Sequence, residues 1–231
     1  FSDAYDSWSS RMEVARQKNR PGDILVLADE TPMRALHLEA KRSAGNALLK
    51  LKQLELALEQ FEMALELDGD DKASREKQAI CLVLLNRFED AREWVKQLTD
   101  DHPQDAESWA LAGRVEKESW IARWRQPGLS PAQMHALARE ENAALGEAID
   151  PYYQAFVADP RHHYSGINAL TLQLLRQHCG GDASQSVIDN LIGGVLWASL
   201  TAQERNRKDY WARASYAELC LLVNPLDSVR K

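Results

Sequence analysis

The chain has few of the residues that interrupt helices or cross-link small folds. Its 231 residues include 11 glycines, 8 prolines and 3 cysteines. No stretch of alternating apolar and polar residues is bounded by Asn-Gly or Asp-Gly turns, which argues against β-hairpins. Cys81, Cys179 and Cys220 are odd in number and lie in helix-like segments, so they indicate reduced thiols of a cytoplasmic protein. These absences leave an all-α fold.

Positive charge and long apolar runs are also scarce. The net charge is −7 and no basic stripe is present, which argues against a nucleic-acid partner. The longest apolar run, around Ile192 to Leu200, is far shorter than the ~20 residues of a membrane span. No signal-peptide pattern opens the sequence. Phe1 is not an initiator, so we expect the natural N-terminus to be missing.

A pattern of residue sizes recurs every 34 positions. In order, the first unit has Gly45, Leu48, Ala57, Phe61, Ala64 and Gly69, and the second has Ala79, Leu82, Ala91, Val95, Leu98 and Pro103. This period resembles the tetratricopeptide helix–turn–helix repeat. We therefore predict an all-α, tetratricopeptide-like right-handed superhelix of antiparallel helix pairs, a fold that usually binds other proteins.

The repeat pattern also predicts the domain boundaries. We expect an N-terminal helical cap or degenerate repeat at 1–37 and a repeat array at 38–231. Within the array the repeats lie near 38–71, 72–105, 106–160, 161–203 and, as a partial unit, 208–231.

The third repeat carries an insertion, because the interval from Gly113 to Ala148 is almost three times the matching interval from Gly45 to Ala57. Its first helix is expected to continue past two tryptophans and to break at 126–128. Ser130, followed by proline and then by glutamine at the third helical position, predicts a helix start with a capping box. Asp150-Pro151 predicts a second helix start or a kink.

Three segments resemble a more specific family. They are the "ALAGRVEKE" segment at 110–118, the "YSGINALTL" segment at 164–172 and the "DYWARASYAE" segment at 209–218. Together they are similar to the tetratricopeptide-like TRAF-binding domain of apoptosis signal-regulating MAP kinase kinase kinases and its bacterial relatives. Glu118 departs from the aspartate usual in that family. The resemblance implies a helical repeat stack with a regulatory, protein-binding role, and it implies no catalytic residue.

Residues of the first helix in each repeat are expected to line the concave face. Arg42 and Asn46 resemble half of the carboxylate clamp of chaperone-binding repeats, although we favour a solvated or intramolecularly paired Arg42. Arg114 and Lys117 indicate either an anionic partner site or an inter-repeat salt bridge, and we favour the salt bridge. His162 is a further concave-face candidate.

Aromatic and small residues give two more sets of candidates. Trp120 and Trp124 form a stripe that suits a core and a partner-binding edge equally well. A structural role in repeat packing is predicted for the following motif residues: Gly45, Gly113, Tyr164, Gly166, Asn168 and Trp211.

Catalytic and metal-binding motifs are weak. His162-His163 and His178-Cys179 invite metal or thiol chemistry, but adjacent helical residues point about 100° apart. The acidic loop at 68–71 lacks the ligand spacing of an EF-hand. We therefore expect no metal, no cofactor and no enzyme activity.

The sequence thus predicts a non-enzymatic, cytoplasmic scaffold that binds another protein or peptide through its concave surface. It has no nucleic-acid or membrane partner in this interpretation. The alternative is a regulatory domain of a longer signalling or effector protein that controls an adjacent catalytic domain.

Overall fold

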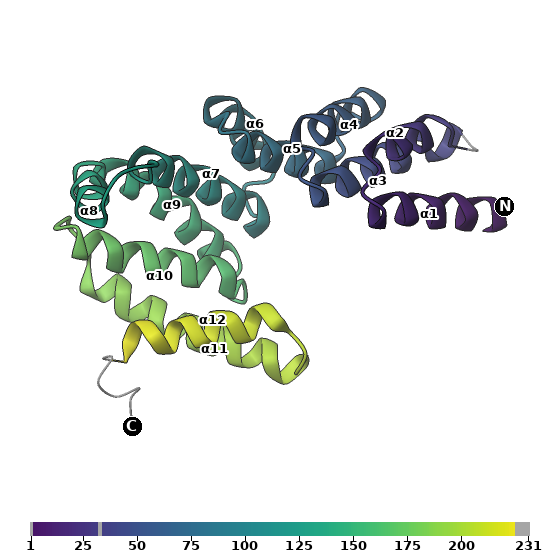
Figure 1. Cartoon of the computed structure of the whole chain (residues 1–231). Helices are drawn as coiled ribbons and strands as arrows, with labels where there is room; N and C mark the ends of the chain where they lie inside the picture. Colours follow the sequence, from purple (N-terminus) through teal and green to yellow (C-terminus); the bar gives the residue numbers. More distant parts are fainter. Residues whose placement is uncertain (1, 32–33, 225–231) are drawn as a thin grey trace. The chain divides into compact units, whose positions relative to one another are not determined.

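The computed structural model describes residues 2–31 and 34–224, and over these ranges it contains helices and no strand (Figure 1). The helices are α1 (Ser2–Gln17), α2 (Pro21–Asp29), the short 3₁₀ helix η1 (Arg34–Leu36), α3 (His37–Lys50), α4 (Leu54–Leu67), α5 (Lys72–Leu84), α6 (Phe88–Asp101), α7 (Ala106–Trp124), α8 (Pro131–Glu140), α9 (Asn142–Ala158), α10 (His163–His178), α11 (Gln185–Arg205) and α12 (Tyr210–Val223). The chain divides into two compact units, Phe1–Trp94 and Val95–Lys231, with the boundary inside α6.

Helices of the first unit pack in chain order. α1 packs on α2, α2 on α3, α3 on α4 and α4 on α5. Trp8 of α1 is buried, and its indole Nε1 donates a hydrogen bond to the Leu27 carbonyl oxygen at 2.7 Å. Lys41 is buried in α3, and its ammonium pairs with Asp29 of α2 at 2.5 Å. These contacts attach the N-terminal helix pair to the first full repeat.

The same type of turn joins α1 to α2, α3 to α4, α5 to α6 and α10 to α11. Asn19, Lys52 and Asn86 all have φ between 52° and 59°, and Gly180 has φ of 82°. In each case the next residue donates its backbone N–H to the carbonyl five residues back, as in the Schellman motif. The first of these turns joins α1 to α2. Whether residues 1–37 form a cap or a degenerate repeat stays a prediction.

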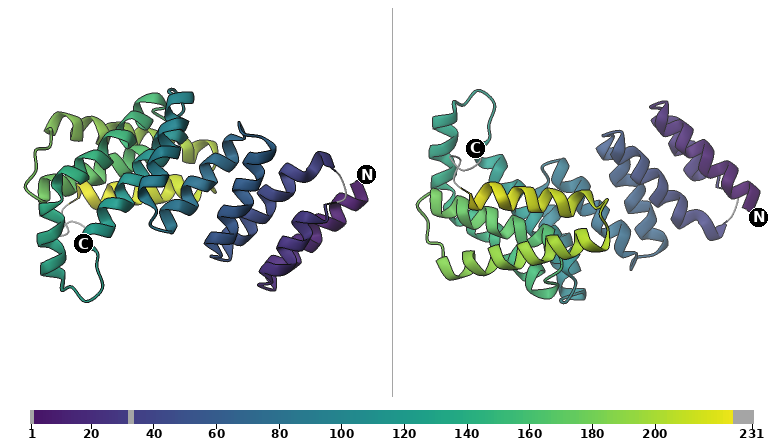
Figure 2. Two further views of the ribbon diagram at one scale, coloured as in Figure 1. Left: turned by 90° about the horizontal axis from the view of Figure 1, so that it is seen from above. Right: turned by 90° about the horizontal axis from the view of Figure 1, so that it is seen from below.

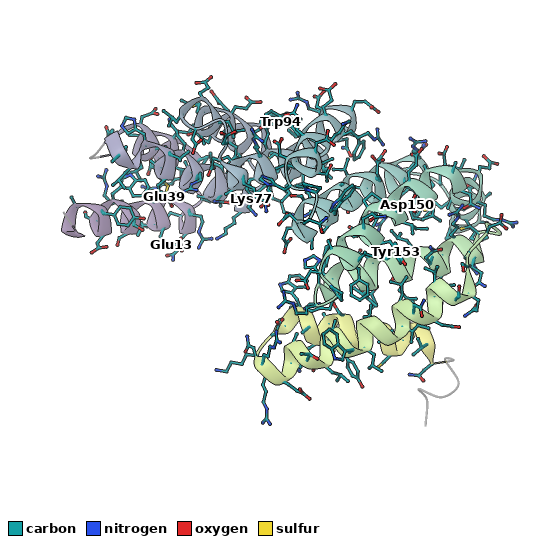
Figure 3. The ribbon with its side chains drawn as sticks, turned by 180° about the vertical axis from the view of Figure 1, so that it is seen from behind. Glu13, Glu39, Lys77, Trp94, Asp150 and Tyr153 are labelled. Atoms are coloured by element: carbon teal, nitrogen blue, oxygen red, sulfur yellow. The ribbon has the colours of Figure 1, made fainter. Side chains whose placement is uncertain are left out.

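The second unit contains the interrupted repeat. α7 packs on α9, α9 on α10, α10 on α11, and α12 on both α10 and α11, whereas α8 packs on α7. The capping box predicted at Ser130 is present, since its side chain accepts from the Gln133 N–H and its backbone N–H donates to the Gln133 side chain. The expected new helix start at Asp150-Pro151 is wrong. α9 runs through Pro151, between Asp150 and Tyr153 in Figure 3.

Glycines at helix crossings allow aromatic rings to touch the backbone. A Cβ added to Gly45 would lie 2.7 Å from the Phe61 ring, and one added to Gly113 would lie 2.6 Å from the Tyr152 ring. The two pairs occupy the same place in repeats one and three, and their separations along the chain differ by the length of the predicted insertion. At Gly166 an added Cβ would approach a neighbouring side chain to 2.7 Å. The predicted packing role of these glycines therefore has a direct steric basis.

α11 and α12 lie side by side at the end of the described chain (Figure 2). Asp209 caps α12 by accepting a hydrogen bond from the Ala212 N–H at 2.9 Å. Ser184 precedes α11, and its side chain makes no capping bond. Residues 225–231 of the expected partial repeat lie outside the described residues. Within the described ranges, no helix combines the length and the apolar character that a membrane span requires.

Candidate functional site

The three motif segments converge on one surface of the second unit. They lie on α7, α10 and α12, and side-chain contacts connect these helices directly. The Lys117 ammonium on α7 donates to the Asn168 amide oxygen on α10 at 2.8 Å. The His163 ring on α10 hydrogen-bonds the Ser215 hydroxyl on α12 at 3.0 Å. Segments that are distant in sequence therefore form one site.

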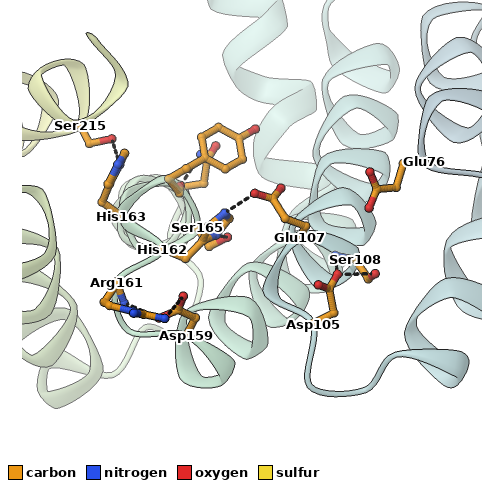
Figure 4. Close-up of polar contacts among 12 residues, drawn as sticks. Glu76, Asp105, Glu107, Ser108, Asp159, Arg161, His162, His163, Ser165 and Ser215 are labelled. Atoms are coloured by element: carbon orange, nitrogen blue, oxygen red, sulfur yellow. Dashed lines mark hydrogen bonds and ion pairs between the residues drawn. The ribbon is translucent and has the colours of Figure 1, made fainter. Parts of the chain in front are cut away.

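A polar cavity of about 500 Å³ opens beside this junction. Its lining combines cationic, acidic and aromatic side chains: Glu107, Arg114, Arg161, His162, His163, Tyr164, Asp209 and Trp211. Most of the charges are matched by a neighbour (Figure 4). Arg161 pairs with Asp159 at 3.0 Å, and His162 reaches Glu107 at 3.1 Å.

The two histidines at the start of α10 point to different neighbours, as shown in Figure 4. His162 Nδ1 hydrogen-bonds the Ser165 hydroxyl at 2.7 Å, while His163 turns toward Ser215. Burial lowers the pKa of His163 below its usual value, with Asp209 raising it and His162 lowering it further. The pair thus connects helices instead of converging on one ligand.

Arg114 differs from the other cations of this cavity. It is half-buried on α7, and among the described residues it has no hydrogen bond or ion pair. The favoured inter-repeat salt bridge for Arg114 and Lys117 is therefore wrong. Lys117 instead donates to Asn168, and its ammonium lies 5.5 Å from the centre of the Tyr152 ring. Asn168 in turn donates to the Tyr164 carbonyl oxygen at 2.8 Å, so it fixes packing as expected.

Trp211 was expected to pack within the repeat stack, and this is wrong. Its side chain is 68% exposed and stands in edge contact with Tyr210. Tyr164, also assigned to packing, has its hydroxyl 3.5 Å from that of the buried Tyr152 and is itself at the surface. Both residues line the polar cavity.

Trp120 and Trp124 contact each other on α7, with ring centres 5.3 Å apart. Trp120 is 3% exposed and belongs to the core of the second unit, and Trp124 packs against that core. Both tryptophans therefore pack in or against the core, as the first alternative predicted. Whether they also form a partner-binding edge stays a prediction.

Arg42, which resembles half of a carboxylate clamp, is paired within the chain. The Arg42 guanidinium pairs with Glu39 at 2.5 Å and with Asp71 at 3.0 Å, so intramolecular carboxylates already occupy it. Asn46 is half-buried one turn further along α3. The paired alternative that we favoured for Arg42 is confirmed.

The thiols and imidazoles of the described residues lie in several separate places. Burial raises the pKa of the Cys81 thiol to about 11, which keeps it protonated and unreactive. The rings of His178 and His135 are in edge-to-face contact, with their centres 5.4 Å apart. Within the described ranges no three His, Cys, Asp or Glu side chains are grouped to hold a metal.

Comparison with known proteins identifies the family. The tetratricopeptide repeats-sensor family (TPR-S) matches residues 53–173, slightly more than half of the chain. The chain belongs to this family. Its match includes α7, α8 and α9 and ends inside α10, so it covers two of the three motif segments.

Solved structures show the same fold. The MamA RS-1 ArsTM double mutant is 14% identical, with a TM-score of 0.56 over 87% of this chain and 98% of that chain. MamA residues 41 to the end from Desulfovibrio magneticus RS-1 are 15% identical, with a TM-score of 0.54 over 86% and 97% of the two chains. No curated protein matches significantly. The predicted all-α, tetratricopeptide-like fold is confirmed.

Sequence reasoning missed several residues of the site. Arg161, Asp209 and the exposure of Trp211 were not predicted. A signal was available for α12, because Trp211, Ala214 and Ser215 share one helical face within the family-like segment. Arg161 and Asp209 precede helices, where repeat spacing carries no information about side-chain direction.

Proposed function

We propose that this chain is a non-enzymatic protein-binding module whose α7–α10–α12 surface captures a carboxylate of a partner protein. The observation that carries this proposal is Arg114, a half-buried cation in a polar cavity with no ion pair among the described residues. A guanidinium binds carboxylates through two parallel hydrogen bonds, which gives geometric specificity as well as attraction. Helical repeat stacks generally serve as binding surfaces of this kind.

The surroundings of Arg114 support a protein partner. Tyr164 and Trp211 line the same cavity, and aromatic side chains next to arginine are typical of the residues that dominate binding energy at interfaces. Arg161 and His162 already have acidic neighbours. An incoming carboxylate therefore has one clear counter-charge, at Arg114.

The test compares two arginines of the same chain. Purified wild type, Arg114→Glu and Arg42→Glu proteins are immobilised, and captured proteins are quantified by mass spectrometry. We expect a partner that wild type and Arg42→Glu retain and Arg114→Glu loses, with helicity unchanged by circular dichroism. Equal capture by Arg114→Glu, or loss of its fold, contradicts the proposed role.

A regulatory role is the second candidate, and the family supports it. The family is described as a sensor, and the three motif segments resemble a regulatory region of signalling kinases. In this proposal the chain controls a catalytic domain of the same cytoplasmic protein. Measuring that domain's activity with and without this region, and with Arg114→Glu, distinguishes it from a stand-alone scaffold.

A further inference from the structure

A second cavity, of about 700 Å³, lies next to the polar one and has a different character. Four helices line it, each with residues at spacings i, i+3, i+4 and i+7: Lys117, Trp120, Ile121 and Trp124 of α7; Pro131, Met134, His135 and Ala138 of α8; Tyr164, Ile167, Asn168 and Thr171 of α10; Trp211, Ala214, Ser215 and Glu218 of α12. Since this spacing selects one face of a helix, four helices present one face each to the same space. Most of the lining is aromatic or aliphatic.

The insertion of the third repeat supplies one wall of this cavity. α8 carries Met134 and Ala138 to the lining, and two contacts attach it to α10 and the residue that follows it. The His135 ring packs on His178, and the Arg139 guanidinium donates to the Cys179 carbonyl oxygen at 3.3 Å. A regular repeat has no such wall, so its inner groove is open to long peptides. A walled space of this volume lies within the size range that is typical of small-molecule sites.

Lys117 gives the apolar cavity a single clear charge preference. Among the described residues its ammonium donates a hydrogen bond to the neutral Asn168 amide and has no carboxylate partner. Glu218 also lines the cavity, but it is exposed and already accepts a hydrogen bond from the Thr171 hydroxyl at 2.7 Å. A partly buried ammonium without a counter-charge favours an anionic group on the occupant.

The indoles add a second preference. The Nε1 atoms of Trp120 and Trp124 are buried and have no hydrogen-bond partner among the described residues, so these side chains present ring carbons to the cavity. Their rings, with Trp211, also offer faces and edges on which an aromatic ring packs well.

We propose that this cavity binds a small, flat, largely apolar aromatic molecule that carries one acidic group. The ring lies among Trp120, Trp124 and Trp211, and the acidic group pairs with Lys117. This site is separate from the partner surface at Arg114, although Tyr164 and Trp211 line both cavities. It goes beyond the proposed function because its ligand is a small molecule instead of a protein.

Two fluorescent probes of the same shape test the proposal. Anilinonaphthalene sulfonate has the aromatic body and one anionic group, and phenylnaphthylamine has the body alone. We expect saturable binding of both to the full chain at one site. Lys117→Gln, which keeps a donor for Asn168, should weaken the sulfonate about tenfold and the uncharged probe by less than about twofold. Lys96→Gln, an exposed lysine on α6, is the matched control and should change neither.

A blocking variant tests the location. Ala138→Trp should abolish binding of both probes by filling the space beside α8. If it lowers the melting temperature, Ala214→Trp on α12 fills the cavity from the other wall. Near-ultraviolet circular dichroism must match wild type, because loosened proteins bind such probes non-specifically.

The outcomes are decisive in both directions. Any of three results overturns the proposal. These are no saturable binding, binding that survives both tryptophan variants, and equal weakening of both probes by Lys117→Gln. Since no partner protein is present in these titrations, their failure leaves the Arg114 surface untouched, and the reverse also holds.

Discussion

The regular repeat α3–α4 and the interrupted repeat α7–α9 share their packing and differ in their connection. In both, a glycine lies under an aromatic ring, Gly45 under Phe61 and Gly113 under Tyr152. Residues 51–53 join α3 to α4, whereas residues 125–141, including α8, join α7 to α9. The helix crossing therefore does not depend on the connection, and the connection is free to build a cavity wall.

The first-helix arginines of the same two repeats differ in their partners. Arg42 in the regular repeat is held by Glu39 and Asp71, while Arg114 in the interrupted repeat has no acidic partner among the described residues. An arginine with two carboxylates contributes to the structure of its own repeat. An arginine without one is available to a ligand. This difference is why the proposed carboxylate site lies in the second unit.

The largest effect should come from the shared packing. Adding a methyl group in Gly45→Ala or Gly113→Ala forces a Cβ to within 2.8 Å of an aromatic ring, so each should destabilise the chain by about 1–3 kcal/mol. Urea unfolding followed by circular dichroism measures this. If only Gly45→Ala is harmful, the interrupted repeat does not reproduce the regular crossing.

Two neighbouring glycines of α11 provide the control. An added Cβ at Gly193 meets nothing within 4 Å, whereas at Gly194 it meets the Phe156 ring at 2.8 Å. Gly193→Ala should stabilise by about 0.5–1 kcal/mol through helix propensity, and Gly194→Ala should destabilise. The same sign for both would show that ring contact is not what decides the outcome.

The sequence predicted the parts of the fold that repeat. The repeat period, the helix start at Ser130 and the glycine at the crossing, Gly113, are local or nearly local properties, so the sequence placed them correctly. The length of the insertion also followed from spacing alone. The helix start suggested by Asp150-Pro151 does not occur, because a helix tolerates proline when tertiary packing holds it, and α9 packs on both α7 and α10. The alternative of a kink at this position stays a prediction.

The candidate site was less predictable, because it depends on side-chain partners from distant helices. The sequence offered Glu118 as a neighbour for Lys117, but the ammonium reaches Asn168 on α10 instead. Trp211 has the spacing of a packed residue, but its side chain is exposed. Periodicity identifies which face a residue occupies and carries no information about what faces it.

A smaller effect should distinguish the two arginines by stability. Arg42→Gln removes two ion pairs of a partly exposed side chain, so it should cost about 0.5–1 kcal/mol. Arg114→Gln breaks no pair among the described residues and should leave the free energy of unfolding unchanged. Denaturant unfolding of both variants measures the difference. A larger loss for Arg114→Gln would mean that it serves the fold and not a ligand.

The smallest effect concerns pH, and it tests whether His163 belongs to the structure of the second unit. Burial holds its folded-state pKa below the ordinary histidine value, so the unfolded chain binds the proton more readily. Stability is then fully present above about pH 6.5, falls as the pH drops below it, and levels off below the folded-state pKa. His163→Gln should flatten this part of the melting-temperature profile, while His102→Gln, at an exposed position, should not. Parallel profiles for wild type and His163→Gln would show that burial does not hold the pKa of His163 below its ordinary value.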